Sequence, residues 1–230
     1  MESKRKLNKN EIQIIRTMFG LDKEYDDFFD LAHRHERPWI KHHQMGRMLR
    51  AESVFEDLIK LILTTNCTWG LTKIMVKNLC ENLGEKIGDR YTFPTPEKMA
   101  KKNETYYRNT IKTGYRSPHL VTISRMVVSK KLDLESWATD QRSYEVLRKE
   151  ILELPGAGPY VAENLLRLLG KFDGLGVDSW VRGRLQKMWN MKKQPTDGMI
   201  LKKYKNYGEY KGLILWCDVT RDWHEGTDSF

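Results

Sequence analysis

The chain has 230 residues, of which 40% are hydrophobic and 31% are charged. This length allows one large domain or two small ones, and the hydrophobic content excludes a wholly disordered chain. Its formal net charge of +9 indicates a polyanionic partner. Three cysteines without a C-x-x-C pair exclude a disulfide framework, a zinc site and a four-cysteine iron–sulfur cluster, and no stretch has the length and hydropathy of a signal peptide or membrane span.

Helical periodicity dominates the chain from about residue 55 onward, and alternating strand patterns are weak and confined to the region before residue 25. Helix boundaries are indicated by Gly84 after one apolar run and by Pro96 at the first position of the next helix. We predict a mainly α-helical protein with helices at 55–63, 71–83, from 96, 119–128, 134–137, 144–152, 161–169 and 207–223.

Basic residues are concentrated in two segments. Residues 101–131 carry eight Lys and Arg against one acidic residue, and residues 182–211 carry nine against two. Two such stretches on an otherwise mildly acidic chain indicate a surface for a polyanion, although two solvated helix faces would have the same composition.

A glycine turn joins two of the predicted helices, in the sequence Leu154-Pro-Gly-Ala-Gly158. Gly156 and Gly158 allow a tight turn and a close backbone approach to another surface. The amides that begin the following helix, near residues 158–161, lack intrahelical partners and favour an anion such as a phosphate. The pattern alone also fits a turn that only connects two packed helices.

This turn, the apolar helix after it and Val177-Asp-Ser-Trp-Val181 together resemble the helix-hairpin-helix/Gly-Pro-Asp (HhH-GPD) DNA glycosylase superfamily, because Asp178 follows Tyr160 by 18 residues. Further segments resemble 8-oxoguanine DNA glycosylases or 3-methyladenine DNA glycosylase II. They are Gly46-Arg-Met-Leu-Arg50, Phe55-Glu-Asp-Leu-Ile59, Thr64-Thr-Asn66, Gly114-Tyr-Arg116, and Phe19-Gly-Leu-Asp22 with Tyr25 and Phe28.

The resemblance implies a two-lobed helical fold with the active site in the cleft. We expect residues 1–66 and 186–230 to form a terminal lobe, and residues 67–185 to form a helical barrel lobe that holds the hairpin (150–166) and Asp178. Only about 45 residues precede the barrel entry, so the amino-terminal β domain of the larger relatives is expected to be reduced or absent.

The resemblance also implies the chemistry. Enzymes of this kind flip the target nucleotide out of the duplex, and a carboxylate stabilises the oxocarbenium-like sugar as the base departs. Asp178 has the matching position, although an aspartate there could also cap a helix. Family members that cut the strand carry a lysine where this chain has Tyr160, so we expect hydrolysis without lyase activity. Lys171 is another lysine that could reach the sugar, but no pattern points to it.

The same resemblance assigns the DNA contacts. It implies a monovalent cation, Na⁺ or K⁺, on the main-chain carbonyls of Leu152, Leu154 and Ala157, and no other cofactor. DNA-binding residues are expected at Asn66, Arg116, Gly156, Gly158, Tyr160 and Arg182. Asn66 stands where relatives insert a side chain into the gap left by the flipped base, and a helix-terminal asparagine is the competing interpretation.

Several aromatic residues bear on the identity of the base. Tyr160, Trp69, Trp180 and Trp216, with Trp223 nearby, are candidates for the base pocket, and an aromatic pocket suits cationic alkylated purines such as 3-methyladenine. The Gly-Tyr-Arg turn favours 8-oxoguanine instead, and a uracil or thymine mismatch glycosylase is a third possibility. Tryptophans also pack helices without binding any ligand.

Two readings of other classes remain. A non-catalytic helix-hairpin-helix DNA-binding module would explain the charge and the hairpin but not the aspartate, and a basic RNA-binding helical protein would make the hairpin a coincidence. Apart from Glu36, no cysteine or acidic residue stands at metal-ligand spacing from the histidines at 33, 35, 42 and 43, so these are expected at the surface or facing DNA. We expect a monomer that acts on damaged double-stranded DNA, in the cytoplasm with the nucleoid or in a nucleus, and not on a membrane.

Overall fold

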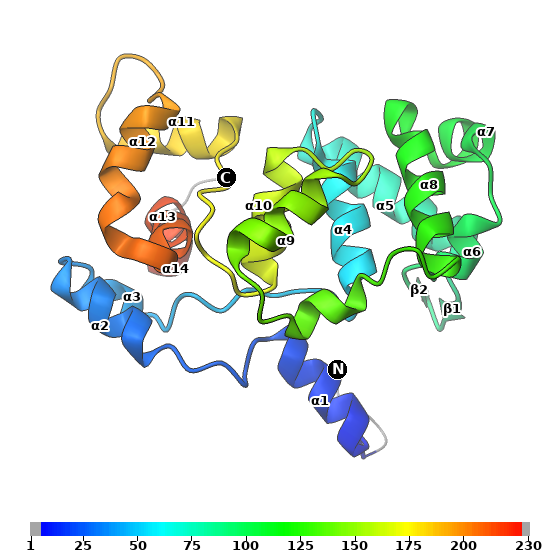
Figure 1. The fold of residues 1–230 in the computed structure, drawn as a ribbon, viewed down its shortest axis with the longest axis horizontal. Coiled ribbons are helices and arrows are strands. Elements are labelled where there is room, and N and C mark those ends of the chain that lie inside the picture. Colours follow the sequence, from blue (N-terminus) through cyan, green and yellow to red (C-terminus); the bar gives the residue numbers. More distant parts are fainter. Residues whose placement is uncertain (1–5, 227–230) are drawn as a thin grey trace. The chain divides into compact units, whose positions relative to one another are not determined.

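A computed structural model describes residues 6–226, and Figure 1 shows that they form mostly helices. The chain divides into two compact units, which we name the terminal unit (Met1–Glu52 with Leu166–Phe230) and the internal unit (Ser53–Leu165). The arrangement of an inserted unit between two terminal segments was expected, but the boundaries differ. Asp178 belongs to the terminal unit, whereas we had predicted it in the same lobe as the hairpin.

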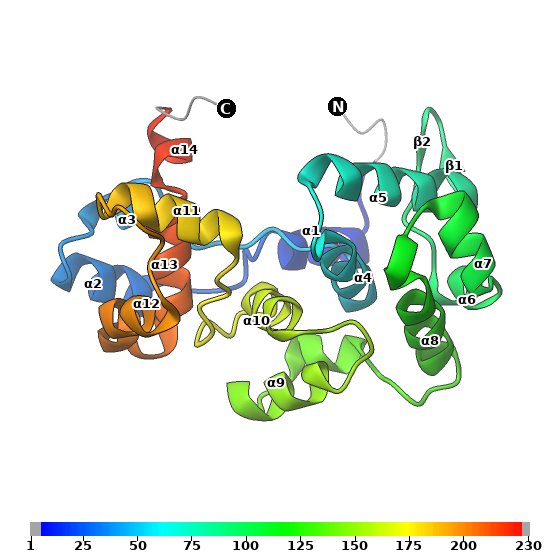
Figure 2. The ribbon, with the colours of Figure 1, turned by 90° about the horizontal axis from the view of Figure 1, so that it is seen from above.

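The terminal unit consists of helices from both ends of the chain. Its elements are α1 (Lys9–Met18), α2 (Asp26–Arg34), α3 (Pro38–His42), α11 (Ser179–Met188), α12 (Asp197–Tyr204), the 3-10 helix η4 (Lys205–Tyr210), α13 (Lys211–Val219) and α14 (Arg221–Glu225). Helix α13 lies among α2, α3, α11, α12 and α14 in Figures 1 and 2, and its residues Leu213, Ile214 and Leu215 are fully buried. The tertiary packing of α13 therefore holds this unit together.

The internal unit contains the barrel helices and the hairpin. Its elements are α4 (Val54–Thr64), α5 (Trp69–Leu83), strands β1 (Lys86–Ile87) and β2 (Arg90–Tyr91), α6 (Pro96–Ala100), α7 (Glu104–Tyr106), the π-helical turn η1 (Tyr107–Ile111), the 3-10 helices η2 (Gly114–Arg116) and η3 (Glu135–Thr139), α8 (Ser117–Val128), α9 (Tyr144–Leu152) and α10 (Pro159–Leu168), whose last turn belongs to the terminal unit. Its core includes Leu58, Ile62 and Met75 from α4 and α5, all fully buried.

Most predicted helices are confirmed, with shifted ends. The helix predicted over 144–152 has the observed bounds, and Pro96 begins α6 as expected. Gly84 ends α5, but with an extended backbone (φ −75°, ψ 175°) rather than the left-handed one typical of a C-cap glycine.

Three predictions of secondary structure were wrong. The region before residue 25 forms helix α1 in place of weak strands, and its capping box between Asn8 and Glu11 starts the helix. The only strands within residues 6–226 are β1 and β2, which pair antiparallel. The single helix expected over 207–223 is broken, because Gly208 has φ 55° and ψ −132°, which no helix accommodates.

Candidate functional site

The hairpin predicted from the sequence is present, with α9 and α10 side by side and joined by a short turn (Figures 1 and 2). The Ala157 amide donates to the Leu154 carbonyl at 3.1 Å and closes the turn. Gly156 has φ +83°, and a Cβ built on it would lie 2.8 Å from Cδ2 of His119, so only glycine fits there. A Cβ on Gly158 would meet nothing within 4 Å, so this side of the turn is open.

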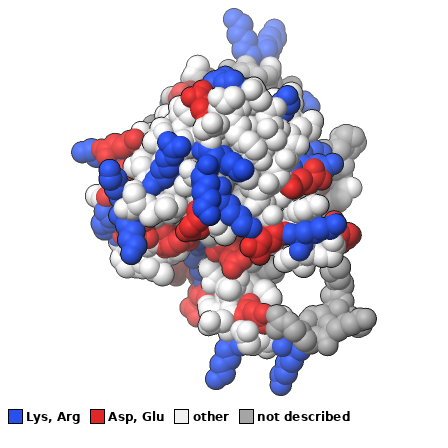
Figure 3. Space-filling model, turned by 90° about the vertical axis from the view of Figure 1, so that its right-hand side faces the viewer, with Lys and Arg blue, Asp and Glu red and all other residues white. Residues whose placement is uncertain are grey.

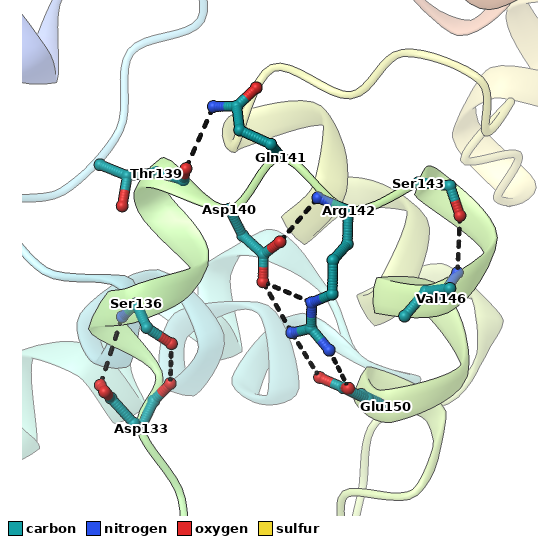
Figure 4. Close-up of polar contacts among 9 residues, drawn as sticks. All are labelled: Asp133, Ser136, Thr139, Asp140, Gln141, Arg142, Ser143, Val146 and Glu150. Carbon is teal, nitrogen blue, oxygen red and sulfur yellow. Dashed lines mark hydrogen bonds and ion pairs between the residues drawn. The ribbon is translucent and has the colours of Figure 1, made fainter.

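The first helix of the hairpin is fixed by polar contacts at its start (Figure 4). Ser143 caps α9 by accepting a hydrogen bond from the Val146 amide. Arg142 donates from Nε to Asp140 at 2.8 Å and also pairs with Glu150 on α9. These contacts connect the preceding loop to α9. They are exposed, and we expect them to orient the helix more than to stabilise the fold.

Tyr160 is the second residue of α10 and is half-buried. The hydroxyl oxygen of Thr64, at the end of α4, lies 3.4 Å from the Tyr160 hydroxyl oxygen. The hairpin and the end of α4 therefore meet through two neutral hydroxyl groups. No amine stands at this position of the hairpin.

Asn66, two residues after α4, is exposed and has a left-handed backbone with φ 47°. Its side-chain amide donates to the hydroxyl of Tyr115 at 3.2 Å, and Thr65 Oγ1 lies 3.1 Å from the same hydroxyl. Tyr115 is 50% exposed. The Gly-Tyr-Arg turn had been recognised only as a resemblance, and nothing in the sequence predicted a functional role for Tyr115 itself.

Arg116, which we had expected to contact DNA, is only 4% exposed. Its guanidinium donates to the carbonyl and hydroxyl oxygens of Thr65 and lies 4.5 Å from the centre of the Tyr115 ring. In this structure Arg116 holds together the segments that carry Asn66 and Tyr115, and its contact with DNA stays a prediction.

Asp178 is the N-cap of α11, as the sequence had allowed beside a catalytic role. Its Oδ1 accepts the Val181 amide at 2.7 Å. No residue in the described part of the chain donates a hydrogen bond to Oδ2. One oxygen thus fixes the carboxylate at the positive end of α11, which stabilises its charge, and the other oxygen is available to a ligand.

Three tryptophans of the terminal unit form one cluster. The ring centres of Trp180 and Trp223 are 5.5 Å apart, and Trp216 lies 6.1 Å from Trp180. Trp180 is 40% exposed and Trp223 is 41% exposed. The guanidinium carbons of Arg167 and Arg184 lie 5.3 Å from the ring centre of Trp216 and 5.9 Å from that of Trp180.

Trp69 had been grouped with these aromatic residues. It begins α5 in the internal unit and is 68% exposed, whereas Trp180 and Trp216 belong to the terminal unit. As the first residue of a helix it has few neighbours of its own, and the structure does not place it in the tryptophan cluster.

Arg182 and the histidines at 42 and 43 make contacts within the terminal unit. Arg182 donates to the Pro195 carbonyl at 2.8 Å and pairs with Asp197, so it organises the loop before α12. The rings of His42 and His43 lie 4.9 Å apart. Nevertheless, within residues 6–226 no group of three or more His, Cys, Asp or Glu side chains could hold a metal ion.

Basic side chains are visible on the internal unit. Figure 3 faces the side on which α6, α7 and α8 lie in Figure 1, and Lys and Arg gather in its upper half above a band of acidic residues. The basic segment 101–131 runs through α7 and α8. No helix in the part of the chain that the structure describes has the length and hydropathy to cross a membrane.

The sequence matches the HhH-GPD superfamily of base excision DNA repair proteins over residues 59–209. This match covers more than half of the chain and includes both the hairpin and Asp178. The chain therefore belongs to the HhH-GPD superfamily of DNA glycosylases, and the resemblance deduced from the hairpin is confirmed.

Individual relatives agree with this assignment. A protein of Methanothermobacter thermautotrophicus named probable N-glycosylase/DNA lyase is 24% identical over 90% of this chain and 74% of its own length. The fold is similar to that of Clostridium acetobutylicum 8-oxoguanine glycosylase/lyase, solved with double-stranded DNA, at a TM-score of 0.76 and 20% identity over 96% of this chain and 77% of that one. It is also similar to 3-methyladenine DNA-glycosylase from Archaeoglobus fulgidus, at 0.72 and 18% over 95% and 77%.

Proposed function

We propose that this protein is a monofunctional DNA glycosylase that hydrolyses the N-glycosidic bond of a flipped, damaged base, with Asp178 as the catalytic carboxylate. The observation that carries the proposal is the state of Asp178. One of its oxygens is bound to the Val181 amide, the other has no donor among the described residues, and exposed Trp180 is two residues away.

A fixed carboxylate suits this reaction. As the base leaves, positive charge develops on the sugar, and a negative group that is already oriented stabilises that charge without reorganisation. The same carboxylate can orient or deprotonate the attacking water. Because the Asp178 carboxylate is held by the backbone of α11, it does not depend on a flexible rotamer.

The absence of strand cleavage is inferred from Tyr160. A Schiff base needs an amine as the nucleophile, and the phenol of Tyr160, which lies 3.4 Å from the Thr64 hydroxyl, cannot form one. The M. thermautotrophicus relative is named probable N-glycosylase/DNA lyase, so the proposal gives this chain a narrower activity than the one in that name.

The hairpin is proposed to bind the DNA backbone together with a Na⁺ or K⁺ ion. The Leu154 carbonyl accepts one hydrogen bond, from Ala157, and no donor within residues 6–226 reaches the carbonyls of Leu152 or Ala157. Three main-chain carbonyls with free lone pairs fit a monovalent cation, which would neutralise part of the charge of a phosphate. The open face at Gly158 then lets the backbone amides approach that phosphate.

Asn66 and Tyr115 are proposed as the residues that enter the duplex. Both are exposed, and they hold each other through the hydrogen bond at 3.2 Å. An aromatic ring can stack on the bases next to a flipped nucleotide, which contributes about 1–3 kcal/mol per base.

The proposed lesion is an alkylated purine, which is a good leaving group and, when cationic, is attracted to exposed aromatic faces in general. 8-Oxoguanine is the second candidate, and a specific observation favours it. Arg167 and Arg184 already lie against Trp216 and Trp180, and a second cation would be repelled by them.

One experiment tests the activity, the lesion and the absence of strand cleavage. The purified protein is incubated with duplexes that each carry one lesion: 3-methyladenine or hypoxanthine, 8-oxoguanine, uracil or a G·T mismatch. We expect release of an alkylated purine, with strand breaks only after alkali. Breaks without alkali and trapping by borohydride would contradict monofunctional hydrolysis. Tight binding without any release would favour a non-catalytic module.

A further inference from the structure

His119 lies directly against the hairpin turn. It is in the first turn of α8, and a Cβ built on Gly156 would lie 2.8 Å from its Cδ2 and 2.9 Å from its Cγ. The side of the imidazole formed by Cγ and Cδ2 therefore packs on the turn. The two ring nitrogens are on the remaining part of the ring.

The two ring nitrogens of His119 have no hydrogen-bond partner within residues 6–226. His119 is half-buried, yet no residue in the described part of the chain forms a hydrogen bond with either nitrogen. Neither nitrogen is among the fully buried polar atoms that lack a partner, so both are reachable by solvent. Because solvent reaches both nitrogens and no protein group occupies them, each is available to form a hydrogen bond with a ligand at this surface.

The surroundings favour an anionic ligand. Helix α8 has neither a side-chain cap nor an acidic residue in its first turn, and α10 also has no acidic residue in its first turn. The start of α10 thus carries no acidic side chain to offset its positive end near the contact between His119 and Gly156, whereas the first amide of α8, at Ser117, is bonded to the Gly114 carbonyl.

We propose that His119 binds DNA directly, by donating a hydrogen bond from its imidazole to the phosphate held at the hairpin or to the adjacent one. This inference rests on the proposed function, in which the hairpin binds the DNA backbone. His119 would add a side-chain donor to a contact otherwise made by backbone amides. It would fix the register of the duplex and carry no information on the base.

Two variants separate this role from simple packing. His119→Phe keeps a flat ring against Gly156 but removes the donor, and His119→Gln keeps a donor but removes the ring. Binding is measured on a duplex with a tetrahydrofuran abasic-site analogue, which needs no turnover. We expect the Phe variant to bind at least about tenfold more weakly, because it loses one hydrogen bond to a charged phosphate, and the Gln variant to stay within about threefold of wild type.

A phosphate scan locates the contact. In a series of such duplexes, a single phosphate near the lesion is replaced by an uncharged methylphosphonate. At the phosphate that His119 binds, the difference between wild type and His119→Phe should disappear, because the contact is already lost. His224→Phe, at an exposed histidine on α14 of the terminal unit, is the matched control and should bind like wild type.

The outcomes are distinct. Unchanged binding by His119→Phe, or a loss that persists at every substituted phosphate, would overturn the inference. If these results came with wild-type base release intact, the proposed function would stand. Conversely, a confirmed phosphate contact in a protein that releases no base would overturn the catalytic proposal alone. Circular dichroism and urea unfolding of both variants establish that the hairpin is folded.

Discussion

The side-chain amide of Asn66 and the hydroxyl of Tyr115 form a hydrogen bond of 3.2 Å between segments that are 49 residues apart. One segment follows α4 and the other is the 3-10 helix η2. Asparagine tolerates the left-handed backbone at φ 47° better than most residues, which allows the chain to turn and present the amide. Beneath the pair, buried Arg116 connects the same two segments through Thr65.

This pair leads to the first prediction. Tyr115→Phe keeps the ring and removes the hydrogen bond, and we expect single-turnover base release to slow about fivefold, as for the loss of one neutral hydrogen bond. Tyr115→Ala should slow it more, because stacking is also lost. Nucleotide flipping is followed by 2-aminopurine fluorescence. Tyr91→Phe, at an exposed tyrosine on β2, is the control, and an equal effect there would contradict the assignment.

Asp178 has two separable roles, in capping and in catalysis. Asp178→Asn should abolish base release and leave DNA affinity and stability nearly unchanged, because asparagine caps helices as well as aspartate does. Asp178→Ala should abolish release and also lower the free energy of unfolding by about 1 kcal/mol. Urea unfolding and single-turnover assays on both variants measure this. An active Asp178→Asn variant would refute the catalytic assignment.

Arg116 is predicted to act through stability. Arg116→Met leaves the Thr65 carbonyl without its donor in a buried position, which should lower the free energy of unfolding by about 2 kcal/mol. The matched control is Arg108→Met, whose exposed pair with Glu104 should contribute less than about 1 kcal/mol. A fully stable Arg116→Met variant that binds DNA more weakly would instead support the DNA contact that the sequence predicts for Arg116.

The terminal unit depends on a buried ion pair. Arg37 donates to both oxygens of Asp218, at 2.8 and 2.9 Å, and the Tyr204 hydroxyl donates to Oδ2 at 2.9 Å. Burial, and then the charge of Asp218, raise the pKa of Tyr204, so this hydroxyl remains a donor at ordinary pH. Asp218 joins α13 to the segment before α3 and to α12.

We expect Asp218→Asn to lower the free energy of unfolding by about 3 kcal/mol, because it leaves the Arg37 charge without its partner. Tyr204→Phe should cost about 1 kcal/mol. The control, Asp222→Asn, breaks the more exposed pair with Arg184 and should cost less than about 1 kcal/mol. Similar losses for Asp218→Asn and Asp222→Asn in urea unfolding would show that burial of the pair is unimportant.

The last prediction adds an activity. Tyr160→Lys places an amine where family members that cut DNA carry their nucleophile. On the duplex from which wild type releases a base, this variant should give strand breaks without alkali and a borohydride-trapped complex. Tyr160→Phe is the control and should give neither. Trapping by wild type would show that another lysine already does this chemistry.

Local features were read correctly from the sequence. The helix-turn-helix at 144–168 could be predicted because proline, glycine and an apolar repeat act within a few residues of each other. The spacing from Tyr160 to Asp178 identified the family, which the match over residues 59–209 confirms. The N-cap at Asp178 could also be foreseen, since a cap depends only on the next three residues.

The contacts between distant segments were decided by tertiary structure alone. Burial of Arg116, pairing of Asn66 with Tyr115 and packing of His119 on Gly156 each join residues at least 37 positions apart, and no local pattern encodes them. The boundary of the units has the same origin, since the contacts of Asp178 and α11 lie with the terminal helices. Propensity and periodicity determine which elements form, whereas side-chain burial determines which of their polar groups remain free to act.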